Sequence, residues 1–268
     1  MGLKADWLIA LESLLKAENI AVENLNHTSF QLLFIPQGKL ILNLVPLHHP
    51  YTPEEFIELQ QAYQLKNIHV IHLWEDIFIT RQAQVLSRIK SFAGLNRSVH
   101  GRNTIIEKIS KEDADLFLNQ YHLQGSVGAR YRFCLVHKNE TVAVATFSNK
   151  RKMTRQGPDY TSAELIRFAT KDGITVTGGL SKLIKHYLKL LAPNDLMSYA
   201  DRDWSLGKSY LSAGFKLKAI TPPSKLYLDP ITLQRYFSHR IPVNPDESAA
   251  APYIEIFNTG NLKFILEC

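Results

Sequence analysis

Cysteine is scarce in this chain of 268 residues: only Cys134 and Cys268 are present. Two cysteines so far apart exclude a disulfide framework and a structural zinc site built from cysteines. Long apolar runs are missing too, since none approaches the roughly 18 residues of a transmembrane helix. The N-terminal leucines are interrupted by Glu12, Lys16 and Glu18, so they form no signal-peptide core. We therefore expect a cytoplasmic protein without a membrane span.

A large excess of charge of one sign is also missing, because 31 basic and 25 acidic residues give a net charge of +6. The excess is unevenly placed. Residues 1–100 carry 8 basic and 9 acidic residues, whereas residues 101–268 carry 23 and 16. This shift and the chain length predict two domains, residues 1–98 and 99–268. The charge does not by itself establish an anionic partner, but if one such as DNA or RNA binds, we expect it on the second domain.

Apolar residues at helical and strand spacing predict a small α/β domain in residues 1–98. Its expected order is helix, hairpin, helix, strand, helix. Thr52, followed by Pro53 and Glu54, is typical of a helix start. The expected helices span residues 3–17, 53–65 and 77–92, and the expected strands span residues 30–35, 40–45 and 67–74.

This order, together with the segment HVIHLWEDIFITRQAQVLSRI, resembles the restriction-endonuclease-like nucleases of the very-short-patch-repair type. The resemblance implies a Mg²⁺ site held by an Asp and a Glu of the hairpin, because hard cations prefer carboxylate oxygens. Alignment on Ile35 and Pro36 places Leu32 and Asn43 at these two positions. Neither residue is a carboxylate. We therefore expect a degenerate nuclease-like domain without a metal and without nuclease activity.

The second domain is expected to be a mixed sheet with flanking helices, so the whole chain belongs to the α/β (α+β) class. Two paired strands, a third strand, a glycine turn, a strong amphipathic helix and a fourth strand follow one another. A short helix and two closing strands complete the pattern. The strands are expected at residues 130–138, 141–148, 164–170, 195–200, 216–220 and 225–228, and the helices at residues 180–191 and 205–213.

Three motifs of this domain, GGLSKL, SYADRDWS and KSYLSAGF, lie within that order of elements. Together they resemble the GNAT N-acyltransferases, in particular a branch found in phage and mobile-element proteins. The resemblance covers roughly residues 103–230, with ELIRF and the C-terminal NTGNLKF as further matches. It implies an acyl-CoA-dependent N-acyltransferase that uses acetyl-CoA or a related acyl-CoA. The acceptor that it implies is a nucleic acid or a small amine.

The glycine turn before the strong helix is the expected cofactor site. A helix N-terminus offers unpaired N–H groups and a positive dipole end to an anion. In the GNAT family this turn holds the pyrophosphate of acetyl-CoA. An ordinary capped turn is the alternative interpretation. The resemblance assigns the cofactor to Thr177, Gly178, Gly179, Leu180, Ser181 and the nearby Lys182, with Ser205 facing the cofactor arm.

Two residues are candidates for proton transfer. The resemblance places Tyr210 near the CoA sulfur, and a tyrosine with a pKa near ~10 is a suitable donor to a leaving thiolate. Packing of the short helix is its alternative role. Asp201, at the end of the fourth strand, could accept a proton from an attacking amine. Its alternative is a salt bridge with Arg202 or Arg167.

The densest basic run predicts contacts with phosphate groups, although solvated loop charge is the alternative. His122 could act as a base or touch a base edge, and Trp204 could stack on a base. The candidates for contact with the substrate or with nucleic acid are Lys150, Arg151, Lys152, Arg155, His122, Arg167 and Trp204.

Two functions therefore stay open on the sequence. The first is a GNAT-like acyltransferase that rests on the glycine turn and Tyr210. The second is a non-catalytic nucleic-acid-binding protein of mobile-element origin, which rests on the basic run.

Overall fold

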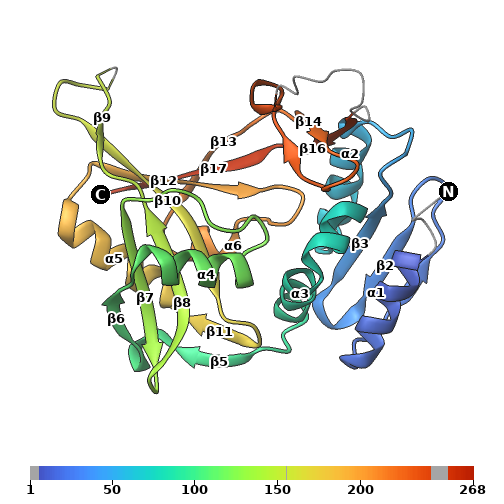
Figure 1. The fold of residues 1–268 in the computed structure, drawn as a ribbon, viewed down its shortest axis with the longest axis horizontal. Helices are drawn as coiled ribbons and strands as arrows, with labels where there is room; N and C mark the ends of the chain where they lie inside the picture. Colours follow the sequence, from blue (N-terminus) through green and yellow to red (C-terminus); the bar gives the residue numbers. More distant parts are fainter. Residues whose placement is uncertain (1–5, 155, 243–252) are drawn as a thin grey trace. The chain divides into compact units, whose positions relative to one another are not determined.

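The computed structural model describes residues 6–154, 156–242 and 253–268 (Figure 1). It confirms the mixed α/β class. The chain divides into two compact units. The first comprises Met1–Gln82, Asp201–Leu206 and Thr221–Asn261, and the second comprises Ala83–Ala200, Gly207–Ile220 and Leu262–Cys268. This division differs from the predicted boundary at residues 98/99, because both units are assembled from separated stretches of the chain.

The first unit contains a four-stranded sheet in the order β1-β2-β3-β4. The strands β2 and β3 form the predicted hairpin, and Thr52 caps α2 in a reciprocal capping box with Glu55. The bounds of these elements are α1 Asp6–Ala17, β1 Glu23–Leu25, β2 Leu32–Ile35, β3 Leu40–Val45, α2 Pro53–Gln64 and β4 His69–Trp74. The predicted positions of the helices and strands in this region are thus confirmed, and β1 is additional.

The strands β3 and β4 of this sheet form a parallel pair. It is in register over six residues, from Leu40 opposite His69 to Val45 opposite Trp74. Every residue of both strands is buried. Burial on both faces explains why these strands are near-continuous apolar runs in the sequence rather than alternating patterns.

Helix α3, Glu75–Phe92, is not continuous. Arg81 has non-helical backbone angles, φ −138° and ψ 34°, so the helix is kinked there. The division between the two units follows directly, between Gln82 and Ala83. The single helix predicted over residues 77–92 therefore contributes to both units.

A three-stranded sheet of the first unit was not expected. Its order is β15-β14-β16, with β14 at Ser224–Leu228, β15 at Arg235–Tyr236 and β16 at Ile254–Asn258. Leu226 and Leu228 of β14 pack in one apolar cluster with Phe56. The prediction that residues 225–228 close the sheet of the second domain is therefore wrong. The alternating leucines of β14 bury themselves in the core of the first unit instead.

The second unit is built on a larger sheet in the order β13-β17-β12-β10-β8-β7-β6, with β9 paired to β10 (Figure 1). The pair β10–β12 is parallel, whereas β6–β7, β7–β8, β8–β10 and β13–β17 are antiparallel. The strand that pairs with β13 is β17, which the sequence analysis did not place. The bounds are β6 Ile105–Lys108, β7 Tyr131–His137, β8 Glu140–Phe147, β9 Arg151–Lys152, β10 Thr161–Thr170, β12 Asp195–Asp201, β13 Lys216–Ile220 and β17 Asn261–Glu267.

Helices cover both faces of this sheet. On β7, Phe133 and Leu135 pack in the same cluster as residues of α5, while the intervening Cys134 packs with residues of α4. Successive side chains of a strand point to opposite faces, so α4 and α5 lie on opposite sides of the sheet. The remaining elements of the unit are α4 Lys111–Tyr121, α5 Gly179–Leu191, α6 Lys208–Ser212 and the short parallel pair β5 Arg97–His100 with β11 Ile174–Thr177.

Candidate functional site

The parallel strands β10 and β12 separate within the sheet. They pair over three positions only, from Ser162 opposite Asp195 to Glu164 opposite Met197, although both strands continue. On its other edge β10 stays paired with β8 as far as Thr170, with an irregularity after Leu165. Beyond Glu164, strand pairing therefore no longer occupies the edges of β10 and β12 that face each other. Such an interruption in a sheet gives a ligand access to backbone groups.

Tyr210 of α6 is connected to this divergence through Ser198 of β12. Ser198 Oγ donates a hydrogen bond to the Leu165 carbonyl at 2.9 Å and is hydrogen-bonded to Tyr210 Oη at 3.2 Å. The Tyr210 ring stacks on Phe264 of β17, with ring centroids 5.1 Å apart. Burial raises the pKa of Tyr210 above 10, while Ser198 and two nearby arginines oppose the rise. Tyr210 therefore carries its proton at neutral pH, as a proton donor must.

Two arginines and one histidine complete the surroundings of Tyr210 within the second unit. Arg88 and Arg167 each act electrostatically on Tyr210 and on His122. Burial, followed by the charges of Arg167 and Arg88, lowers the pKa of His122 to about 3. Its Nδ1 accepts a hydrogen bond from the N–H of Gln124 at 3.1 Å. The low pKa keeps His122 neutral, and its role as a base stays a prediction.

The glycine turn leads into α5 as predicted. Gly178 has a left-handed φ of +73° and caps the helix, which begins at Gly179. A Cβ on Gly179 would lie 2.6 Å from the Val176 side chain, whereas a Cβ on Gly178 would meet open space. The first N–H groups of a helix have no acceptor within the helix, so those of Gly179, Leu180 and Ser181 need acceptors from elsewhere. Thr177 is exposed beside this turn, and its hydroxyl is 3.0 Å from that of Ser98.

The ammonium group of Lys182 is hydrogen-bonded within the protein. Its ammonium donates hydrogen bonds to the carbonyl oxygens of Gly101, at 2.9 Å, and of Thr104. The lysine thereby fixes the segment that follows β5 against α5. Contact of Lys182 with the cofactor stays a prediction, and its ammonium already bonds to two carbonyl groups of the protein.

The first unit contains Asp201, Trp204 and Ser205, whereas Tyr210 belongs to the second unit. The Asp201 carboxylate accepts a hydrogen bond from the N–H of Asp203 at 3.0 Å, and its carbonyl accepts from the N–H groups of Trp204 and Ser205. These bonds form a turn that precedes α6. The predicted helix over residues 205–213 is therefore shorter, and Ser205 lies outside it. Trp204 is only 7% exposed, so its ring is not available for stacking on a base. The role of Asp201 as a base stays a prediction.

The basic run lies at the strand β9 and beside it. Lys150 Nζ donates to the Leu191 carbonyl at 3.0 Å, and the Arg151 guanidinium lies 3.7 Å from the Glu164 carboxylate. Lys152 is exposed. Arg155 lies outside the described residues. Contact with nucleic acid stays a prediction for this run, and two of its side chains already contact the protein itself.

The positions compared with a nuclease metal site are occupied by the core of the first unit. Leu32 is 1% exposed, and the Asn43 side-chain amide lies 3.0 Å from His72 Nδ1. Burial lowers the pKa of His72 to about 3. In residues 6–154, 156–242 and 253–268, no cluster of three or more His, Cys, Asp or Glu side chains could hold a metal ion. Within the same ranges no helix has the length and apolar character needed to cross a membrane.

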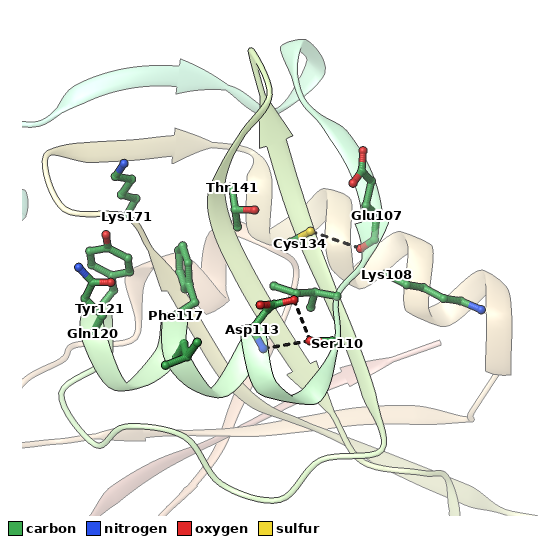
Figure 2. Close-up of a pocket in the computed structure, with 12 residues that line it drawn as sticks. Glu107, Lys108, Ser110, Asp113, Phe117, Gln120, Tyr121, Cys134, Thr141 and Lys171 are labelled. Carbon is green, nitrogen blue, oxygen red and sulfur yellow. Dashed lines mark hydrogen bonds between the residues drawn. The ribbon is translucent and has the colours of Figure 1, made fainter.

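A surface hollow of about 460 Å³ lies on the α4 side of the large sheet (Figure 2). Cys134 lies in it, with Sγ 3.6 Å from the Glu107 carbonyl, and burial raises the pKa of this thiol. A thiol with a raised pKa is a poor nucleophile. The hollow is lined by neither Tyr210 nor the glycine turn, so it is separate from the candidate site.

No protein-family model matches the chain. No curated protein matches it either. A GNAT family acetyltransferase from Elizabethkingia anophelis with acetyl-CoA bound is similar in structure, with 14% identity, a TM-score of 0.35, and coverage of 62% of this chain and 99% of that chain. A Bacillus subtilis acetyltransferase in complex with CoA has 13% identity, a TM-score of 0.36 and the same coverage. The ribosomal-protein-S18-alanine N-acetyltransferase from Escherichia coli has 14% identity and a TM-score of 0.37, and the match covers 61% of this chain and 93% of that chain.

Proposed function

We propose that the second unit is an acyl-CoA-dependent N-acyltransferase of the GNAT type. The observation that carries this proposal is the position of Tyr210 at the divergence of β10 and β12. A protonated hydroxyl there, held by Ser198 and by stacking on Phe264, suits a reaction that releases a thiolate. The order of the elements around it agrees with the resemblance found in the sequence.

The residues at the N-terminus of α5 fit the anionic part of acetyl-CoA or a related acyl-CoA. The N–H groups of Gly179, Leu180 and Ser181 have no acceptor within the helix. Open space lies beside Gly178, where a side chain would otherwise stand. These amides would hold a pyrophosphate with the help of the helix dipole. Acyl-CoA would supply an activated acyl group and a thiolate leaving group.

Tyr210 would hold the proton that the leaving sulfur needs. Its pKa is raised above 10 by burial, and a thiol has a pKa near ~8.5, so transfer of the proton to a thiolate would have to be coupled to its release. The amine loses one proton when it becomes an amide. That proton can restore the tyrosine, which keeps the proton balance of the reaction closed.

The test is calorimetric titration of the full chain with acetyl-CoA and with CoA. Ser181→Asp places a negative charge at the start of α5 and should weaken binding by about tenfold or more through like-charge repulsion. It should not harm the helix, because an acidic residue is favourable in its first turn. Leu190→Asp makes the same charge change at an exposed position near the far end of α5 and should bind like the wild type. Absence of heat with the folded wild type would refute the proposal.

Nucleic-acid binding is a second candidate function, and the exposure of Arg151 and Lys152 on β9 favours it. We expect the Lys150/Arg151/Lys152→Ala triple variant to bind DNA or RNA with a shallower salt dependence, because each lost phosphate contact reduces the number of counterions released. The Lys108/Lys185/Lys189→Ala variant removes three exposed lysines elsewhere and is the matched control. Equal binding by the two variants would count against this candidate.

For the first unit we propose a nuclease-like scaffold that has lost its metal carboxylates. The order α1, β1–β3, α2, β4, α3 supports it, as do the apolar surroundings of Leu32 and the bond between Asn43 and His72. Mg²⁺-dependent cleavage of DNA by the wild-type chain would overturn this proposal.

A further inference from the structure

Four side chains of the second unit form what we name the two-arginine site. They are Arg88 from the second part of α3, His122 after α4, Arg167 from β10 and Tyr210 from α6. Arg167 Nε donates to the Gly125 carbonyl at 3.2 Å, and the Gly125 N–H donates to the His122 carbonyl at 2.9 Å. On α3, the side chain of Gln84, about one turn before Arg88, donates to the carbonyl of Asn119 on α4 at 2.9 Å. Both arginines act electrostatically on His122 and on Tyr210, so the two positive charges lie around one place. That place is next to the hydroxyl proposed above as the proton donor.

Neither arginine is neutralised by the protein. Arg167 donates from Nε to the Gly125 carbonyl at 3.2 Å and from Nη1 to the Ile166 carbonyl at 3.0 Å. The Arg88 guanidinium lies over the Phe92 ring, 4.8 Å from its centroid. In the described part of the chain neither forms an ion pair with a carboxylate. Glu164 acts on Arg167 electrostatically, but its carboxylate is the ion-pair partner of Arg151.

Arg235 in the first unit shows how this protein treats a buried guanidinium that has only a structural role. Its Nε and Nη2 donate to the two oxygens of Asp76, at 2.6 and 2.8 Å. A partly buried charge without such a partner is costly, since burial removes water that is not replaced by a counter-charge. Burial accordingly lowers the pKa of Arg88 and of Arg167. Two such groups at one place indicate that the counter-charge comes from outside the chain.

The two arginines and His122 present hydrogen-bond donors at the two-arginine site. Arginine can only donate. Because Nδ1 of the neutral His122 already accepts a hydrogen bond, its proton is on Nε2, which can therefore donate. A set that consists of donors suits a group that consists of acceptors. Carboxylates and phosphates are such groups, and their geometry matches the planar fork of arginine.

We propose that the acceptor molecule carries a carboxylate or phosphate group that Arg88 and Arg167 bind beside Tyr210. This inference rests on the acyltransferase function proposed above and narrows its acceptor to an acidic amine. Binding of the anion would fix the acceptor in place and position its nitrogen for the reaction, which is how bidentate arginine contacts contribute to catalysis.

The test uses the full chain without acyl-CoA, at neutral pH, with inorganic phosphate and acetate as probes. The Nε–H resonances of Arg88 and Arg167 are followed by NMR while either anion is added against chloride at equal ionic strength. We expect a saturable shift of both resonances with one common affinity. A response to phosphate, to acetate or to both supports the proposal and tells which oxyanion is preferred. Two results would overturn the proposal. One is that chloride produces the same shifts, and the other is an adventitious ion only, which shifts that do not saturate would indicate.

Substitutions then connect the response to the site. Arg88→Gln should remove the response of Arg167 to the anion, and Arg167→Gln should remove that of Arg88. Arg130→Gln makes the same charge change at an exposed position and should leave both responses intact. Where a Gln variant does not fold, Arg167→Lys keeps the charge and removes the fork, and it should weaken binding. Persistence of the response in every variant would refute the assignment.

His122 provides a second readout. Phosphate is still an anion in the acidic range where His122 titrates, and when bound between the arginines it should raise the pKa of His122 by at least about one unit, because an opposite charge within about 4–6 Å has an effect of that size. His72, whose pKa is also about 3, lies in the first unit and should not respond. Because no acyl-CoA is present, a negative result here leaves the calorimetric test of the proposed function valid. Conversely, failure to bind acetyl-CoA would leave an observed anion site standing.

Discussion

The main sheet of each unit contains a pair of parallel strands, β3–β4 in the first and β10–β12 in the second, and the two pairs differ in how far they stay together. The pair β3–β4 is in register over six residues, whereas β10–β12 separates after three. The first pair is buried along its whole length. Along the second pair, Ser198 bonds a β10 carbonyl with its side chain at the point where strand pairing has ended.

The polar groups beside the two strand pairs also differ in whether they have partners within their unit. In the first unit Asn43 and His72 are bonded to each other, and Arg235 is neutralised by Asp76. In the second unit Arg88 and Arg167 have no carboxylate partner in the described residues. A sheet whose strands stay paired, beside a guanidinium that is neutralised within the unit, can serve as a scaffold. A separated pair with unmatched charges beside it has the properties of a binding site.

The largest expected effect tests how the open pair is supported. Gly207 has a φ of +71°, and a Cβ there would overlap the Phe264 ring on which Tyr210 stacks. We expect Gly207→Ala to lower the free energy of unfolding by about 3 kcal/mol, from backbone strain and overpacking together. Denaturant unfolding measures the loss. Gly173→Ala has a similar φ of +69° with open space around the Cβ, so it should cost about 1 kcal/mol. Equal losses would show that packing on Phe264 is unimportant.

A smaller effect tests the closed pair through pH. The pKa of His72 is about 3 in the folded chain, below the unfolded value of about 6.5, so the unfolded state binds the proton more readily. Stability from this group is present above pH 6.5 and is lost as the pH falls. Between pH 7 and pH 5 we expect a loss of about 2 kcal/mol. His72→Phe, which keeps an aromatic ring against Phe56, should remove that part of the pH dependence. If the stability of the wild type and of His72→Phe depended on pH in the same way, this expectation would be contradicted.

The smallest effect concerns the bridge at the divergence. Ser198→Ala removes the hydrogen bonds to the Leu165 carbonyl and to Tyr210, and it should cost about 1 kcal/mol. Since Ser198 lowers the pKa of Tyr210, the variant should raise that pKa further, which titration of ¹³C-labelled tyrosine can measure. Ser162→Ala makes the same change in the paired part of β10 and should leave Tyr210 as it is. If the pKa of Tyr210 rises equally in both variants, Ser198 has no specific effect on it.

Much of the second unit could be predicted from the sequence, because its signals are local. The apolar spacing of α5, the glycines at its start and the position of Tyr210 in a short helix all lie within a few residues of each other. The bond between Lys182 and Gly101 could not be predicted, because the two residues are 81 positions apart. The strand β17 was missed for a related reason. Its partner β13 precedes it by some forty residues, and β14, which looked like the closing strand, joins another core.

Arg88 shows most plainly what local patterns leave out. It lies in a helix that the sequence assigned to the first domain, where a basic residue on a helix surface needs no special explanation. Only the kink at Arg81 and the contacts of the folded chain bring its charge to Tyr210 and His122. Within a single sequence, no signal connects it with Arg167, 79 positions further on. Unmatched charges become visible only when the groups around them are known.

The position of β17 has a consequence for the order in which the large sheet can close. This strand follows β13 by some forty residues, yet it lies inside the sheet, between β13 and β12. The sheet around Tyr210 can therefore close only after the intervening stretch, which belongs to the first unit, has been synthesised. Until β17 pairs, the edges of β12 and β13 lack a partner and are open to pairing with another chain.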